Sequence, residues 1–155
     1  MSDLSPDQTR EMARLAVLRG YGILDTPNEP EFDRLVRRVA HMFNMPIALI
    51  SFLDETRSWF KARYGLDSSE TPSAISFCTH AIKGAEVFIV PDATLDERFA
   101  CNPLVTGHPH IRFTLVHRSP RRAGDGSARS ASSIRCRALA CRRTSVGISR
   151  RWRAT

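Results

Sequence analysis

The chain has 155 residues, of which 42% are hydrophobic and 25% charged, so it is long enough for one domain and too short for a second of useful size. Its longest apolar run, residues 46–53, is far shorter than the roughly 20 residues of a membrane-spanning helix, and no signal-peptide pattern precedes it. A membrane or secreted protein is excluded on these grounds, and the formal charge of +7 leaves a cytoplasmic protein with or without a nucleic-acid partner.

Charge divides the chain into two parts. Residues 1–113 contain 12 Lys and Arg against 15 Asp and Glu, a net charge of −3. Residues 114–155 contain 11 Arg, no Lys and one acidic residue, a net charge of +10. We therefore predict one domain in residues 1–113 and an Arg/Ser/Ala-rich tail in residues 114–155.

The first predicted elements are two helices. Ser5 is a preferred N-cap, Pro6 suits the first helical position and Gly20 is typical of a helix end, which predicts a helix over about residues 6–20. A second helix is predicted to open with a capping box from Asn28 to Glu31. Its predicted core-facing stripe is Phe32, Leu35, Val36, Val39, Met42 and Phe43.

A β-hairpin follows. Residues 46–53 are apolar on both alternating faces, as in a central strand covered on two sides. Residues 58–64 alternate, which predicts Phe60, Ala62 and Tyr64 on one face and Trp59, Lys61 and Arg63 on the other. The remaining expected elements are a polar loop at 65–74, a short helix at 76–83, a strand at 87–90, a loop or helical turn at 95–104, and a strand that begins at 110–113.

An ordered set of short motifs carries a family resemblance. The motifs are Y-G-I-L-D-T-P at 21–27, F-D at 32–33, P-I-A-L-I-S at 46–51, W-F-K-A at 59–62, I-S-F-C at 75–78, V-P-D-A at 90–93, R-F at 98–99 and N-P-L-V at 102–105. Each is weak alone. Together they cover residues 10–113 and resemble the GAF domains at the N-terminus of bacterial histidine kinases and cyclic di-GMP enzymes such as diguanylate cyclases.

The resemblance implies a fold and a function. The fold class is α/β, with a central antiparallel sheet flanked by helices and a small-ligand pocket on the far side of the sheet. The function is small-molecule sensing for a signal-transduction protein, without catalysis and without a cofactor. The implied partners are an unknown small molecule and a second copy of the chain, bound through the N-terminal helices.

The pocket is expected near segments that hold eight candidate ligand-binding residues. They are Trp59, Phe60, Lys61, Arg63, Phe77, Cys78, His80 and Asp92. Lys61 and Arg63 could bind an anionic ligand such as a phosphate through charge-assisted hydrogen bonds. The alternative is that these two side chains form a solvated strand face.

Metal binding and catalysis have weaker support in the sequence. Cys78-x-His80 and His108-x-His110 contain ligand residue types but no established ligand spacing, so we predict no metal site. The sequence has no G-x-S-x-G, phosphate-loop or H-E-x-x-H motif. We predict no catalytic residue.

The remaining polar residues allow two further enzymatic interpretations. Asp92 and Asp96 fit turn and cap positions better than a general acid/base pair. A thiol-based reductase is a third hypothesis, resting on Cys78 and Cys101. None of the four cysteines has C-x-x-C spacing or secretory context, which favours free thiols.

The tail is compatible with a shifted reading frame. After Ile111-Arg112-Phe113, the resembled family continues with Y-A-G-A-P-L and later L-G-T-L-C-V-I-D, two core strands that this sequence lacks. Codons permitted for residues 126–135, regrouped by one base, spell L-G-T-L-C-V-I-D-P. Codons for residues 113–117 with one C restored spell F-Y-A-G-A. We predict a frameshift after Phe113, an incomplete sheet and a disordered tail.

The predicted domain at residues 1–113 and the tail at residues 114–155 suggest two alternative functions. The leading hypothesis is a truncated, non-functional fragment of a small-molecule-sensing module, in which the strand at 46–53 lacks a ladder neighbour. The alternative is a nucleic-acid-binding protein that uses the Arg-rich tail. Eleven arginines would bind any polyanion in a salt-dependent way, although no interleaved aromatic residues accompany them.

Overall fold

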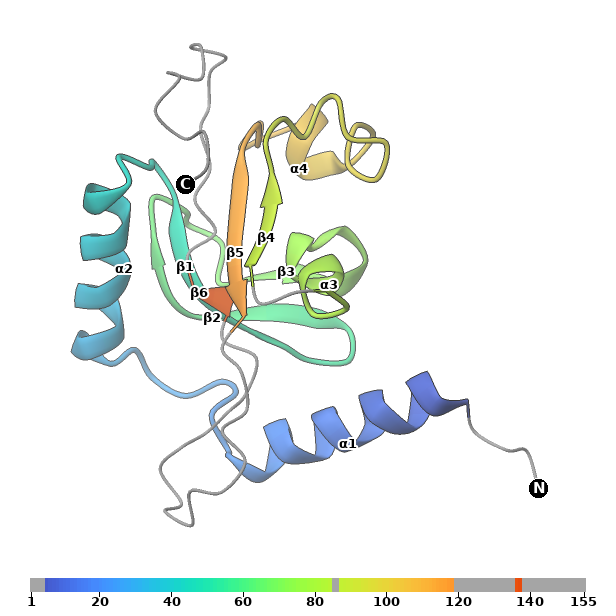
Figure 1. Ribbon diagram of the computed structural model, residues 1–155. Coiled ribbons are helices and arrows are strands. Elements are labelled where there is room, and N and C mark those ends of the chain that lie inside the picture. Colours follow the sequence, from blue (N-terminus) through green and yellow to red (C-terminus); the bar gives the residue numbers. More distant parts are fainter. Residues whose placement is uncertain (1–4, 85–86, 119–135, 138–155) are drawn as a thin grey trace, which may run out of the picture.

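The computed structural model describes residues 5–84, 87–118 and 136–137. In this part of the chain, helices lie on both faces of one antiparallel sheet with the strand order β3-β2-β1-β6-β5-β4 (Figure 1). The strands are β1 (Ala48–Leu53), β2 (Arg57–Tyr64), β3 (Glu70–Pro72), β4 (Val87–Val90), β5 (Thr114–Arg118) and β6 (Cys136–Arg137). The helices are α1 (Pro6–Gly20), α2 (Pro30–Met42), η1 (Ser73–Ile75), α3 (Phe77–Ala81) and α4 (Pro103–Thr106). The predicted α/β architecture is confirmed. None of the described helices is both long and apolar enough to cross a bilayer.

Helix α1 has the predicted bounds. The Ser5 hydroxyl accepts a hydrogen bond from the Gln8 amide at 3.3 Å, and the Gln8 side chain accepts one from the Ser5 amide at 2.9 Å, which completes a capping box. Leu15 and Leu18 are its buried residues. The Arg14 guanidinium donates to the Leu53 carbonyl and so joins α1 to the end of β1.

Helix α2 begins later than its predicted cap. Its N-cap is Glu29, whose side chain makes no capping hydrogen bond, so the predicted capping box from Asn28 to Glu31 is wrong. Pro30 occupies the start of the helix, where its fixed φ favours helical backbone. The apolar stripe packs on β1 and β2 through Val36 and Ala40, but Met42 at its end is 68% exposed.

A β-bulge changes the faces predicted for β2. Ile50 pairs with Ala62 and Ser51 pairs with Phe60, so Lys61 has no residue opposite to it. A bulge adds one residue to one strand and reverses its side-chain alternation. Ala62 therefore lies in the same core cluster as Trp59, on the face opposite Phe60. The predicted grouping of Phe60 with Ala62 is wrong.

Two hydrophobic cores cover the two faces of the sheet. The α2 face holds Leu18, Val36, Ala40, Ala48, Ile50, Phe52, Trp59 and Ala62. The other face holds Ile47, Leu49, Phe60, Phe77, Cys78, Ala81, Val90, Ala93, Phe99, Val105, Ile111 and Val116. Strand β1 contributes alternate residues to each core, which explains why it is apolar on both sides.

Three strands differ from the prediction: β3 and β6 were not expected, and β5 begins later than expected. β3 lies inside the predicted polar loop at 65–74 and pairs with the start of β2. In β5, Thr114–His117 pair with Val90–Val87 of β4. The strand starts later than the predicted start at residues 110–113, because His110 has φ 58°, which interrupts extended backbone. β6 pairs with β1 at Ile50 and Ser51.

The expectation that two core strands are absent is therefore wrong for the described residues. Strands pair through backbone N–H and C=O groups, which nearly every sequence supplies, so the residues present here can pair with β1 in place of the expected strand sequences. β6 nevertheless spans two residues beside the six of β1. Residues 126–135, where the alternative frame would encode the second strand, lie outside the described residues.

Candidate ligand pocket

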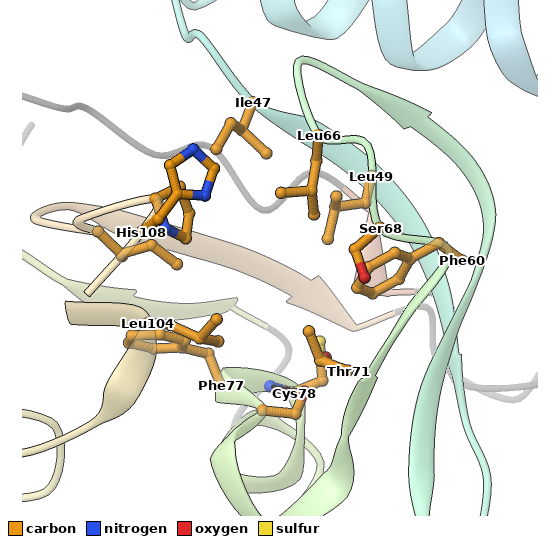
Figure 2. Close-up of a pocket in the computed structure, with 13 residues that line it drawn as sticks. Ile47, Leu49, Phe60, Leu66, Ser68, Thr71, Phe77, Cys78, Leu104 and His108 are labelled. Carbon is orange, nitrogen blue, oxygen red and sulfur yellow. Dashed lines mark hydrogen bonds between the residues drawn. The ribbon is translucent and has the colours of Figure 1, made fainter. Parts of the chain in front are cut away.

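A cavity of about 210 Å³ lies between the sheet and the layer formed by α3 and α4 (Figure 2). Strand residues form one wall, the 66–71 loop and the start of α3 form the second, and α4 with the loop after it forms the third. The lining residues are Ile47, Leu49, Phe60, Leu66, Ser68, Thr71, Ser76, Phe77, Cys78, Leu104, His108, Pro109 and Ile111.

The floor beside the cavity is an aromatic cluster centred on Phe99, which is fully buried. The Phe77 ring stacks on Phe99 with centroids 4.3 Å apart, and the rings of His80 and Phe88 meet its edge at 4.8 and 6.1 Å. Such pairs stabilise beyond their buried area. Phe77 therefore presents a fixed ring to the cavity.

Hydrogen bonds from Asn102 hold the third wall. Its side-chain amide donates to the Ile75 carbonyl at 2.9 Å, and its side-chain oxygen accepts from the Leu104 amide at 2.9 Å as the N-cap of α4. The Ile111 amide donates to the Leu104 carbonyl at 2.8 Å. These contacts tie α4 to the start of α3 and to the far end of the wall.

Most polar side chains in the lining already bond to the protein. The Ser68 hydroxyl donates to the Glu70 carbonyl at 2.7 Å, and the Ser76 hydroxyl accepts from the Cys78 amide at 3.2 Å. The Cys78 thiol lies 3.4 Å from the Ser51 hydroxyl. A ligand in the cavity would meet mainly apolar atoms.

Three of the eight predicted site residues line the cavity: Phe60, Phe77 and Cys78. Trp59 and Lys61 lie on the opposite face of the sheet. Arg63 is half-buried opposite Leu49 and does not line the cavity. The sequence motifs thus located the right segments, but alternation along β2 puts Trp59 and Lys61 on the face opposite Phe60, and the bulge at Lys61 changes only the face of the residues that follow it.

Lys61 is neither solvated nor directed at the cavity. Its side chain has 0% exposure, and its ammonium donates to the Thr26 hydroxyl at 2.7 Å and the Pro27 carbonyl at 2.8 Å and pairs with the Glu29 carboxylate at 2.7 Å. The solvated-face interpretation of Lys61 is wrong. These three partners match the three donors of an ammonium, which leaves none for an anionic ligand.

His80 and Asp92 lie outside the cavity lining. Burial, reinforced by the nearby Arg98 and Lys83 charges, lowers the pKa of His80. Hydrogen bonds from the side chain and backbone of Thr94 lower the pKa of Asp92, which closes a turn as its position predicted.

Asp96 forms its side-chain hydrogen bond with Arg98 and does not pair with Asp92. A hydrogen bond from the Arg98 side chain, 2.6 Å away, lowers the pKa of Asp96. A general acid needs a raised pKa, so the two aspartates have the wrong electrostatics for that role.

The other candidate ligands and thiols are dispersed. Within residues 5–84, 87–118 and 136–137, no three His, Cys, Asp or Glu side chains converge as a metal site. Cys78 is buried, whereas Cys101 is exposed. Nine of the eleven tail arginines lie outside the described residues, so nucleic-acid binding by the tail is a prediction from sequence alone.

Most of the third wall could not be predicted from the sequence. Leu104, Pro109 and Ile111 lie in short, non-periodic segments, and the sequence indicates His108 only as a candidate metal ligand. No local pattern indicates that such residues meet a sheet face. The alternation of Ile47 with Leu49, followed by Phe60, is the one signal that could have located the first wall.

The described residues form an α/β domain with a concave, mainly apolar pocket on one face of its sheet, the kind of pocket in which proteins bind small molecules. The family model of the GAF domain matches residues 28–117. The chain belongs to the GAF domain family, whose members are sensory and regulatory domains of signalling proteins.

The comparisons with individual proteins agree with this assignment. A cyclic di-GMP phosphodiesterase of Pseudomonas aeruginosa is 47% identical over 103 residues, which cover 66% of this chain and 18% of that protein. This chain therefore matches less than a fifth of its curated relative.

One solved structure shows the same fold, and a second is more distantly similar. The GAF domain of an Acinetobacter phosphoenolpyruvate-protein phosphotransferase superposes with a TM-score of 0.56 at 18% identity, covering 97% of this chain and 84% of that one. A far-red cyanobacteriochrome photoreceptor has a TM-score of 0.47 at 14% identity, covering 86% and 82%.

Proposed function

We propose that this chain is the small-molecule-sensing regulatory module of a cytoplasmic bacterial signal-transduction protein. The cavity between β1, β2 and α3 carries the proposal, because it is lined by residues from separate segments between Ile47 and Ile111. A molecule bound there would contact Leu49, Phe77 and Leu104 together, so its binding energy would depend on how these elements are placed relative to one another.

The proposed output is turnover of cyclic di-GMP. Its support is the 47% identity to one part of a cyclic di-GMP phosphodiesterase. The regulatory module itself performs no catalysis in this proposal. Its proposed protein partner is a second copy, through α1, where Met12 is 57% exposed.

Native mass spectrometry of the chain purified from a bacterial lysate tests the sensing function. We expect a small molecule to copurify at one per chain. Leu104→Phe should lower the bound fraction at least about tenfold, because the added ring fills the cavity that Leu104 lines. Leu95→Phe is the matched control, since Leu95 is 82% exposed and outside the cavity. A chain that retains nothing, and whose melting temperature no lysate fraction changes, would contradict the proposal.

We further propose that a lost base near codon 113 truncates the module and leaves it without a signalling output. The composition break at 113 and the two-residue β6 beside β1 support this proposal. Resequencing codons 105–140 of the genomic DNA should reveal one additional base. Peptides from residues 120–155, detected by mass spectrometry in the host together with an unchanged DNA frame, would show that the tail is genuine.

A further inference from the structure

The size of the cavity limits what it can hold. Its volume of about 210 Å³ exceeds the roughly 150 Å³ of an apolar cavity that binds benzene. It is smaller than the roughly 300 to 1,000 Å³ of pockets that enclose drug-sized ligands. A compound with one aromatic ring, or two fused rings, fits this volume.

Charge is the second property of the lining that restricts the ligand. Among the residues that the structure describes, no Lys, Arg, Asp or Glu side chain contributes to the cavity wall. An ionised ligand transferred there would lose its hydration without gaining a counter-charge, which is costly. Lys61, the cation closest in sequence to Phe60, directs its ammonium to Thr26, Pro27 and Glu29 instead.

Two of the three hydroxyl residues of the lining already bond within the protein. Ser68 donates to the Glu70 carbonyl and Ser76 accepts from the Cys78 amide, which leaves Thr71 as a hydroxyl that a ligand can meet. The exposed His108 lies at the edge of the cavity in Figure 2, where its ring can bond to one polar substituent. The wall around it consists of Ile47, Leu49, Phe60, Leu66, Phe77 and Leu104.

From size, charge and hydrogen bonding together, we infer that the pocket binds small, uncharged, mainly apolar compounds of one or two rings and excludes cyclic mono- and dinucleotides. This inference rests on the proposed sensing function. It assigns apolar contact as the main source of affinity, with hydrogen bonds to Thr71 or His108 that orient the ligand.

Calorimetric titration of the full chain with four probes tests the inference. The probes are phenol, indole, cyclic GMP and cyclic di-GMP. We expect indole and phenol to bind saturably at one site and indole to bind at least about 100-fold more tightly than either nucleotide. Leu104→Phe should weaken indole binding at least about tenfold, and Leu95→Phe should leave it unchanged. Melting curves of both variants verify that they fold.

Each other outcome counts against the inference. Nucleotide binding that Leu104→Phe abolishes, without indole binding, would overturn the ligand class and leave the sensing function intact. Indole binding that Leu104→Phe does not weaken would place the ligand outside this cavity. If none of the four probes binds but the purified chain still retains a small molecule from the lysate, the ligand class is wrong and the sensing function stands. If no probe binds and the chain retains nothing, the sensing function is wrong as well.

Discussion

Gly65→Ala is expected to lower the free energy of unfolding by more than about 4 kcal/mol, enough to unfold much of the population. Gly65 follows β2 with φ +70°, a conformation that L side chains rarely adopt. A Cβ at this position would lie 1.8 Å from the Pro46 carbonyl oxygen and 3.0 Å from its carbon. Both are backbone atoms next to β1, so neither can move aside without displacing the strand.

Gly22→Ala is the matched control for Gly65→Ala. Gly22 also has a positive φ, +56°, but a Cβ there would meet no atom within 4 Å. It should cost about 1 kcal/mol, the conformational penalty alone. Urea unfolding followed by circular dichroism measures both variants. Similar losses for the two would show that the contact with Pro46 is relieved at little cost.

The contact between Gly65 and Pro46 also bears on the pocket. Leu66 and Ser68 follow Gly65 and line the cavity, and Ile47 follows Pro46 and lines it from the other side. The close approach of the two backbones therefore sets the distance between two walls. A side chain at Gly65 would separate them even if the domain remained folded.

Lys61→Met is expected to lower the free energy of unfolding by about 3 kcal/mol. The substitution keeps most of the side-chain volume but removes the buried ammonium that donates to the Thr26 hydroxyl and the Pro27 carbonyl and pairs with the Glu29 carboxylate. Hydrogen bonds to a charged group contribute about 1.5 to 3 kcal/mol, so the loss of all three contacts falls at the upper end of this range. Guanidinium unfolding followed by tryptophan fluorescence measures the loss, since Trp59 lies in the same core.

Lys83→Met provides the comparison, because Lys83 is the other lysine of the chain and is exposed. It should change stability by less than about 0.5 kcal/mol. The two lysines also differ in chemical accessibility, so acetic anhydride should modify Lys83 well before Lys61 in the folded chain. Equal stability losses, or equal labelling, would refute the assignment of Lys61 as a buried link between β2 and the segment before α2.

The sequence by itself determined the local elements and the family. The cap at Ser5, the proline at position 6 and Gly20 bounded α1, and a short apolar run closed by Pro91 bounded β4 at residues 87–90. These features depend on neighbours within a few residues, so a local pattern reports them. The order of the motifs also identified the GAF fold, because each motif is local and their order along the chain can be read directly from the sequence.

Only the tertiary structure decided the faces of β2, the role of Lys61 and most of the pocket. The bulge is a property of two paired strands and leaves no periodic signal in either one. Lys61 is buried because a segment some 35 residues earlier in the chain supplies its partners. His108 and Leu104 meet Leu49 and Phe60 only when α4 folds against the sheet. Contacts between distant segments depend on the packing of the whole domain, and no short window of sequence contains that information.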